Sequence, residues 1–127
     1  MKFVAKLKQA GIPLGIGTDL IGNDYQSLPA PYISELKQFV KLGYTSSEVL
    51  SIATRDNARL LDMGDRLGSL ETGKLADVLV VAGQPDTNLD DLANVKIVIR
   101  DGYTQVENGR LFLPRHVASP MPEPKKN

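Results

Sequence analysis

The stretch IPLGIGTD at residues 12–19 decides the fold class. Leu14 and Ile16 supply its apolar bulk, and its two glycines leave room for the close approach of another backbone. The preceding residues 2–10 place apolar side chains among lysines at helical spacing, and a glycine stands just past their end. A helix, a glycine and a short apolar strand are typical of a parallel α/β unit. We therefore expect a buried strand here that leads into Asp19.

More helices are expected between this strand and residue 64. Residues 20–31 are rich in Gly, Asn, Ser and Pro and predict a long loop. A helix should follow over about 32–42, and TSSE at 45–48 has the form of a capping box that begins another. Thr54 is expected to cap a last helix, which Gly64 ends. The side chains expected to face inward are Ile33, Leu36, Phe39, Val40, Val49, Leu50, Ala53, Ala58, Leu60, Leu61 and Met63.

Beyond residue 64 the pattern changes to short extended segments. The dipeptides Asp101-Gly102 and Asn108-Gly109 are strong signals for two-residue hairpin turns. The polar segment 83–94 predicts a connecting loop. The extended segments expected are 67–70, 78–82, 95–100, 103–107 and 110–113. The sequence thus predicts an α/β region followed by a small β meander.

Both predicted regions lack partners within this sequence. A single strand of parallel type needs neighbours on both sides to satisfy its backbone groups, and no second strand of that type is predicted. A meander of so few strands also leaves open edges. We therefore expect the folded chain to associate, either as a homo-oligomer or with a missing N-terminal part.

Composition excludes several classes of function. The 127 residues suggest one domain, and fifteen basic residues balance fifteen acidic ones, so charge gives no argument for nucleic acid or membrane partners. The absence of cysteine excludes disulfides and thiolate metal sites. The longest apolar run, residues 78–82, is far too short for a membrane span. Residues 1–8 are amphipathic rather than apolar like a signal peptide, so localisation stays open, with the cytoplasm as the default.

Asp19 is the most plausible chemical centre in the sequence. Sites in α/β proteins lie beyond the carboxyl ends of the parallel strands, and Asp19 stands at that position before a long loop. An aspartate there can bind a metal ion and accept a proton from water. The alternative is that Asp19 caps the turn or helix that follows, and the short motif alone favours this alternative.

Other candidate residues are weaker. His116 is the only histidine, and we expect it to be a surface residue, because a zinc site needs three or four converging ligands. Asp24 is expected to be a solvated loop carboxylate. Asp77 should satisfy backbone groups of a turn. The group of Asp86, Asp90 and Asp91 lacks the glycine and final glutamate of a calcium loop and predicts a polar loop.

Several stretches together resemble the amidohydrolase superfamily. GIGTD at 15–19 is similar to the end of the eighth barrel strand, and ATRDNARLL at 53–61 is similar to the helix that follows the barrel. LGSLETGKLADVLVV at 67–81 resembles the return to the small β-sandwich, and VIRDG at 98–102 resembles its closing strand. The order and spacing match from about residue 2 to residue 110. The branch with imidazolonepropionase-like and Xaa-Pro dipeptidase-like (prolidase-type) enzymes looks most similar.

The resemblance implies a fold and a site. Residues 1–64 would be the last strand and helices of a TIM-type (β/α)8 barrel, residues 65–113 part of the composite β-sandwich, and residues 114–127 a flexible tail. Asp19 would be a metal ligand and the general base toward the hydrolytic water. The family's cofactor is a divalent metal, most commonly zinc, and its substrates are small molecules such as cyclic amides and dipeptides.

The sequence departs from the family pattern in what it lacks. The His-x-His of the first barrel strand, the bridging lysine or glutamate and the later histidines have no counterpart here. We therefore expect the C-terminal portion of a C–N hydrolase, inactive as an isolated chain and without a tightly bound metal. The alternatives are a non-catalytic remnant that acts as an oligomeric binding or structural module, and an unrelated small α/β domain.

Overall fold

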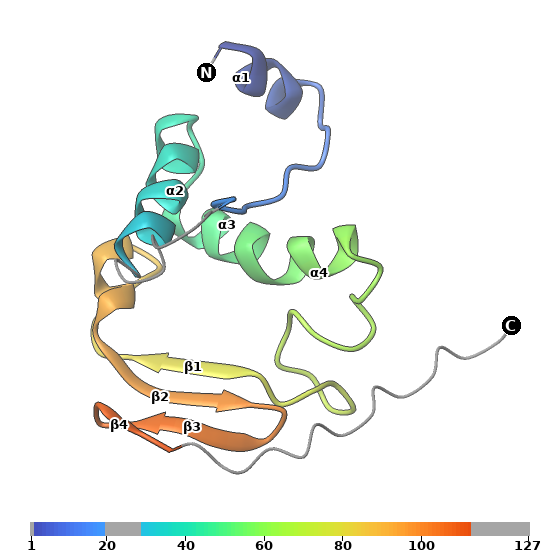
Figure 1. The fold of residues 1–127 in the computed structure, drawn as a ribbon. Coiled ribbons are helices and arrows are strands. Elements are labelled where there is room, and N and C mark those ends of the chain that lie inside the picture. The colour runs from blue at the N-terminus through green and yellow to red at the C-terminus, as the bar shows by residue number, and fades with distance from the viewer. Residues whose placement is uncertain (1, 20–28, 113–127) are drawn as a thin grey trace, which may run out of the picture.

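The computed structural model describes residues 2–19 and 29–112, which form a helical layer and a small sheet (Figure 1). The loop 61–77 and the segment around residues 82–94 join the two layers (Figure 1). The elements, in chain order, are α1 (Lys2–Gln9), α2 (Ala30–Lys41), α3 (Ser46–Ser51), the π-helical η2 (Ile52–Asp56), α4 (Asn57–Leu60), β1 (Val78–Val81), the 3₁₀ helix η3 (Leu89–Ala93), β2 (Val95–Arg100), β3 (Tyr103–Glu107) and β4 (Arg110–Leu111).

The segment after α1 contradicts one expectation. Residues 12–19 form no β-strand, although Ile16 is buried as expected. The physical reason is that a strand exists only through its ladder, and none of the described strands is parallel to this segment or pairs with it. The segment instead runs as an irregular chain from α1 down to the helical layer (Figure 1).

Helix α2 was predicted correctly and ends in a Schellman motif. Gly43 has φ of +89° and donates its N–H to the carbonyl of Val40 at 2.9 Å, while Tyr44 donates to Phe39 at 3.3 Å. The rings of Phe39 and Tyr44 also pack with centroids 5.9 Å apart. This pattern uses the last free carbonyls of the helix, which explains why the chain turns sharply here.

The next helix is continuous where a break was expected. The capping box is confirmed: the Thr45 hydroxyl accepts from the Glu48 N–H, and the Glu48 carboxylate accepts from the Thr45 N–H. Thr54 caps nothing and lies inside η2, where its hydroxyl donates to the Leu50 carbonyl at 2.7 Å. A threonine can form this bond to the preceding turn in mid-helix, so its presence did not mark a helix start.

The helix ends at Leu60, and its left-handed cap residue stands two residues before the expected glycine. Asp62 has φ of +59° and donates its N–H to the Arg59 carbonyl, while Met63 donates to the Ala58 carbonyl at 2.8 Å. Asp62 therefore takes the left-handed cap position that was assigned to Gly64. Aspartate tolerates this conformation better than most residues, which is why no glycine is needed here.

The sheet follows the predicted meander with the order β1-β2-β3-β4, all antiparallel. Both two-residue turns are confirmed, because Asp101, Gly102, Asn108 and Gly109 all have positive φ as a type I′ turn requires. The extended segment expected at 67–70 is not a strand and packs as a loop against the helix.

The core lies where the helical layer meets η3. Leu89, from the segment expected to be only a connecting loop, is 3% exposed and packs in the core cluster. Val40, Leu60 and Leu61, expected inside, are exposed and do not belong to this cluster. The buried residues of the cluster are Ile16, Leu36, Phe39, Val49, Ile52 and Leu89.

Candidate functional site

Asp19 ends the segment that enters the core at Ile16. Its side chain is exposed, and its backbone is left-handed with φ of +48°. Left-handed non-glycine residues sometimes mark functional sites. Here the other three, Asp62, Asp101 and Asn108, are ordinary turn or cap residues. The conformation is therefore compatible with either reading of Asp19, a site residue or a turn residue.

Asn57 fixes the chain just before Asp19. Its amide oxygen accepts from the Ile16 N–H at 2.9 Å, and its amide nitrogen donates to the Ile16 carbonyl at 2.8 Å. One side chain thus satisfies both backbone groups that a neighbouring strand would otherwise pair. Sequence reasoning did not single out Asn57. The available signal was an asparagine inside a predicted helix. Asparagine has a low helix propensity, so its presence there indicates that its amide has a hydrogen-bond partner.

The glycines of this segment differ in what they allow. A Cβ at Gly15 would lie 3.0 Å from Leu60 Cδ1 and 3.1 Å from Asn57 Oδ1, so glycine permits the close approach to the helix. A Cβ at Gly17 would meet nothing within 4 Å. The close neighbours at Gly15 are side chains of the helix, so the close approach of another backbone is found at neither glycine.

The described residues do not by themselves fit a catalytic metal. Residues 2–19 and 29–112 hold no group of three or more His, Cys, Asp or Glu side chains that could bind an ion. Asp19 could supply one carboxylate, whereas a catalytic zinc takes three protein ligands.

The remaining sequence candidates have structural roles or lie outside the described residues. Asp77 accepts from the Asp101 N–H at 2.7 Å, which confirms its predicted role at a turn. Asp91 accepts from the Gln84 N–H at 2.9 Å and Asp90 pairs with a lysine of α2, but both lie in the 3₁₀ helix η3 where a polar loop was predicted. Asp24 and His116 belong to the part of the chain that the structure does not describe.

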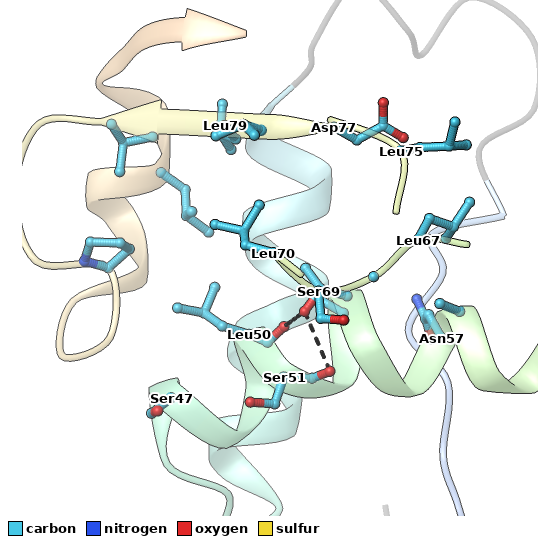
Figure 2. Close-up of a pocket in the computed structure, with 18 of the residues that line it drawn as sticks. Ser47, Leu50, Ser51, Asn57, Leu67, Ser69, Leu70, Leu75, Asp77 and Leu79 are labelled. Carbon is cyan, nitrogen blue, oxygen red and sulfur yellow. Dashed lines mark hydrogen bonds between the residues drawn. The ribbon is translucent and has the colours of Figure 1, made fainter. Parts of the chain in front are cut away.

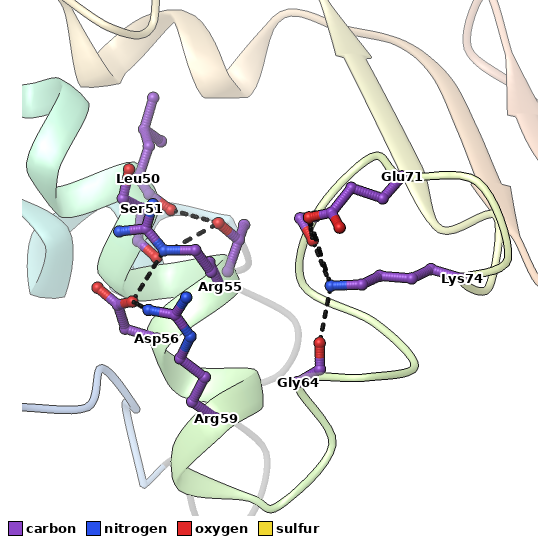
Figure 3. A network of polar contacts seen from close by, with 10 residues as sticks. Leu50, Ser51, Arg55, Asp56, Arg59, Gly64, Glu71 and Lys74 are labelled. Atoms are coloured by element: carbon purple, nitrogen blue, oxygen red, sulfur yellow. Dashed lines mark hydrogen bonds and ion pairs between the residues drawn. The ribbon is translucent and has the colours of Figure 1, made fainter.

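One polar network braces the loop between helix and sheet, and a second lies on the helix (Figure 3). Lys74 donates to the Gly64 carbonyl at 2.7 Å and to the Ser69 hydroxyl at 2.6 Å, and Ser69 donates to Glu71 at 2.7 Å. The hydrogen bond from Ser69, helped by the charge of Lys74, lowers the pKa of Glu71. The lowered pKa makes Glu71 a poor proton acceptor, and the Ser69 hydroxyl accepts from the Lys74 ammonium group, so this network favours a structural role.

On the helix, Asp56 forms the second network with two arginines. Its carboxylate accepts from Arg55 at 3.0 Å and from Arg59 at 3.2 Å (Figure 3). The hydrogen bond and charge of Asp56 raise the pKa of Arg55. These surface pairs lie on the helix and engage the Asp56 carboxylate.

An open cavity of about 740 Å³ separates the helix from β1. Figure 2 shows Leu79 of the strand, Leu70 of the loop and Leu50 of the helix lying between the two elements. Leu70 and Leu79 are 76% and 52% exposed, so the cavity presents apolar surface to water. It is lined mainly by aliphatic side chains and contains no cluster of ionisable groups, which favours packing over chemistry.

The arrangement of an irregular segment, a helix and a four-stranded meander has known counterparts. The profile of the Amidohydrolase family matches residues 2–104. This chain belongs to the amidohydrolase family. No described helix of this amidohydrolase chain has the length and hydropathy needed to cross a membrane.

Individual family members share both sequence and fold with this amidohydrolase chain. An imidazolonepropionase of Brevibacillus brevis is 32% identical over 109 residues, which cover 84% of this chain and 26% of that enzyme. The crystal structure of a Xaa-Pro dipeptidase is 32% identical with a TM-score of 0.70, covering 81% of this chain and 24% of that one. An adenosine deaminase of Xanthomonas campestris with bound zinc matches with 25% identity and a TM-score of 0.64, covering 86% and 29%. The chain thus spans about a quarter of the length of these relatives.

Proposed function

We propose that this amidohydrolase chain forms the C-terminal portion of an enzyme that hydrolyses C–N bonds. The observation that carries the proposal is the continuous family match over residues 2–104 together with the quarter-length coverage of the relatives. The named activities of those relatives, an imidazolonepropionase, a dipeptidase and a deaminase, favour cyclic amides, dipeptides or related small molecules as substrates.

Within that enzyme, residues 1–64 would be the end of the barrel, and residues 65–113 would be part of the composite sandwich. Asp19 would supply one carboxylate to a divalent-metal site, most commonly zinc in this family, and would accept a proton from the attacking water. The two hydrogen bonds between the Asn57 amide and the Ile16 backbone support this role, because they fix the backbone three residues before Asp19. The other ligands would come from outside the described residues.

A chimera tests the proposal. The last quarter of the Brevibacillus brevis imidazolonepropionase would be replaced by this chain, and hydrolysis of that enzyme's own substrate would be measured. We expect activity that falls by about 100-fold or more in Asp19→Asn, since a positioned proton acceptor contributes about 10²–10⁴-fold. Asp24→Asn, which changes a carboxylate five residues later in the sequence, is the control and should keep the activity. A folded, active chimera that is indifferent to Asp19→Asn would refute the assignment.

The isolated chain provides the complementary measurement. With zinc or manganese added, it should turn over neither dipeptides nor cyclic amides, because one carboxylate cannot hold a catalytic ion. Turnover by the pure chain that disappears in Asp19→Asn would contradict this expectation and would mean that the site is completed without the rest of an enzyme.

A further inference from the structure

The helix that carries Asn57 contains one residue more in its middle turn than a regular α-helix would. This turn, η2 (Ile52–Asp56), is π-helical, and the Asn57 N–H donates to the Ile52 carbonyl five residues earlier. In an α-helix the same bond would reach back four residues. Single π turns inside α-helices are rare and occur frequently at functional sites. The side chains that follow η2 are therefore shifted by one position relative to an uninterrupted α-helix.

This extra residue decides which side chain reaches the segment before Asp19. Residues four apart share a face of an α-helix, so Asp56 would stand over the buried Ile52 in a regular helix. With the π turn, Asn57 takes that place. Ile52 and Ile16 belong to the same core cluster, and the Asn57 amide makes its two hydrogen bonds to the Ile16 backbone. Asp56 instead binds two arginines of its own helix (Figure 3), so the turn brings an amide, and not a carboxylate, to Ile16.

An amide matches the groups that Ile16 presents, whereas a carboxylate does not. The Ile16 backbone offers one donor and one acceptor, and the Asn57 side chain supplies one acceptor and one donor. An ionised aspartate only accepts hydrogen bonds, so it would leave the Ile16 carbonyl without a donor and set a negative charge beside it. The pairing therefore depends on both the asparagine and the turn that orients it.

We propose, on the basis of the function proposed above, that the π turn makes Asn57 a positioning residue for Asp19. Two residues separate Ile16 from Asp19, a chain length of roughly 10 Å at most, so a hold on the Ile16 backbone restricts where the carboxylate can lie. A misplacement of about 1 Å at a reacting group can lower a rate by about 100-fold. Asn57 thus acts through the backbone of Ile16, and not on the reacting atoms.

Hydrogen exchange of the Ile16 N–H, followed by NMR on the full chain, tests the hold without any measurement of activity. In Asn57→Ala we expect protection of this N–H to fall by about 10-fold or more, because its acceptor is lost. Asp56→Asn/Asn57→Ala moves the amide by one position and should show the same loss, while Asp56→Asn alone is the matched control and should keep the protection. Deletion of Thr54 should also keep it, because Asn57 then follows Ile52 by four residues in a regular α-helix.

Two results of this measurement would overturn the proposal, once circular dichroism shows that the variants are folded. The first is protection restored in Asp56→Asn/Asn57→Ala, which would mean that position 56 and not position 57 faces Ile16. The second is protection lost on deletion of Thr54, which would mean that the register of the helix does not place Asn57.

The chimera described above tests the effect on Asp19. Asn57→Ala should lower its kcat by about 10-fold or more and leave KM nearly unchanged, since the amide acts on the position of Asp19. In Asp19→Asn the same change should have little further effect, because the two residues act as a unit. A full, independent loss in that background would show a merely structural role and overturn the proposal. A chimera indifferent to Asp19→Asn would refute the proposed function instead, and the exchange at Ile16 would still decide whether Asn57 holds the segment.

Discussion

Asp62 shows how a single backbone conformation ends the long helix. It is left-handed with φ of +59° and occupies the position that usually holds glycine. Comparing glycine with alanine at position 62 measures the free-energy cost of the left-handed backbone, because neither residue has a polar side chain. We expect Asp62→Gly to be more stable than Asp62→Ala by about 1 kcal/mol, since alanine is strained in this region and glycine is not. Urea unfolding of the two variants measures the difference. Equal stabilities would mean that the cap is not left-handed in solution.

Asn57 is the residue on which the position of Asp19 depends. Its amide makes two hydrogen bonds to Ile16, and neither backbone group of Ile16 has a strand partner among the described residues. We expect Asn57→Ala to cost about 1–3 kcal/mol of unfolding free energy, as two part-buried hydrogen bonds are lost. Chemical denaturation measures this loss. Asn94→Ala, which removes an exposed amide with one weak contact at 3.5 Å, should change stability little. A similar loss of unfolding free energy in both variants would mean that the hydrogen bonds between Asn57 and Ile16 do not stabilise the fold.

At this scale sequence reasoning worked where the residue type carries its own geometry. Asp77 was predicted to hydrogen-bond backbone groups of a turn, and its carboxylate accepts from the Asp101 N–H. Thr54 was predicted as a cap but makes the alternative bond to the Leu50 carbonyl, which the same residue type allows. The role of Asn57 depends on a partner 41 residues away, and no local pattern encodes that distance.

The loop between helix and sheet depends on one close approach. Gly68 and Gly73 both have φ near +90°, but a Cβ at Gly68 would lie 2.5 Å from the Ala58 Cβ, whereas one at Gly73 would meet nothing within 4 Å. We expect Gly73→Ala to cost about 1–2 kcal/mol from backbone strain alone. Gly68→Ala should cost about 1–3 kcal/mol more, because the loop must also move off the helix. Denaturant unfolding of the pair measures the excess, and its absence would show that the loop is not packed here.

The capping box at Thr45 should make stability depend on pH. Hydrogen bonds from the Thr45 backbone and, secondarily, from its hydroxyl lower the pKa of Glu48 from its ordinary value of 4.5. A pKa that is lower in the folded state contributes stability above the unfolded pKa and loses it as pH falls through the folded pKa. We expect the chain to melt above Glu48→Gln near pH 6 and to lose this advantage near pH 3.

Thermal melts followed by circular dichroism measure this difference. Thr45→Ala keeps the backbone donor and removes only the hydroxyl, so it should retain part of the pH dependence while losing about 0.5–2 kcal/mol of cap energy. A difference between the chain and Glu48→Gln that stays constant from pH 6 to pH 3 would exclude the carboxylate as its source.

The helices and strands that could be predicted from sequence are those marked by turn, cap or apolar-spacing patterns within their own residues. The two hairpins follow from Asp-Gly and Asn-Gly turns, and α2 from its apolar spacing and the glycine at its end. The strand expected within residues 12–19 did not form. Its apolar pattern indicates burial, whereas a strand also requires a partner strand, which the described residues do not provide. The η3 helix was missed because its polar residues concealed one core leucine, Leu89.

At the scale of the whole molecule, metal binding tests whether Asp19 has partners. We expect calorimetric titration with zinc to show no affinity tighter than roughly millimolar, because tight binding needs three or more converging ligands. Asp19→Ala should give the same heats as the unmodified chain. Stoichiometric micromolar binding that is lost in Asp19→Ala would contradict this and would show that a complete ligand set is present.

The sequence predicted the family and the order of its parts, while the relation between the parts came from the structure. The match over residues 2–104 bears out the resemblance read from separate short stretches. How the helix and sheet leave a cavity between them could not be predicted, because no single stretch contains both of its walls. The chemistry at Asp19 stays a prediction for the same reason, since one ligand does not define a site.

The spacing of contacts along the chain has a consequence for the order of folding in time. Strands β2, β3 and β4 are joined by two-residue turns, and hairpins of this kind form within about 1–10 μs. The contact between Ile16 and Asn57 instead closes 41 residues, and the pair between Lys37 and Asp90 closes 53. Such distant contacts form late, because more chain entropy is lost before they stabilise anything. We therefore expect Asp19 to reach its place after the C-terminal hairpins have formed.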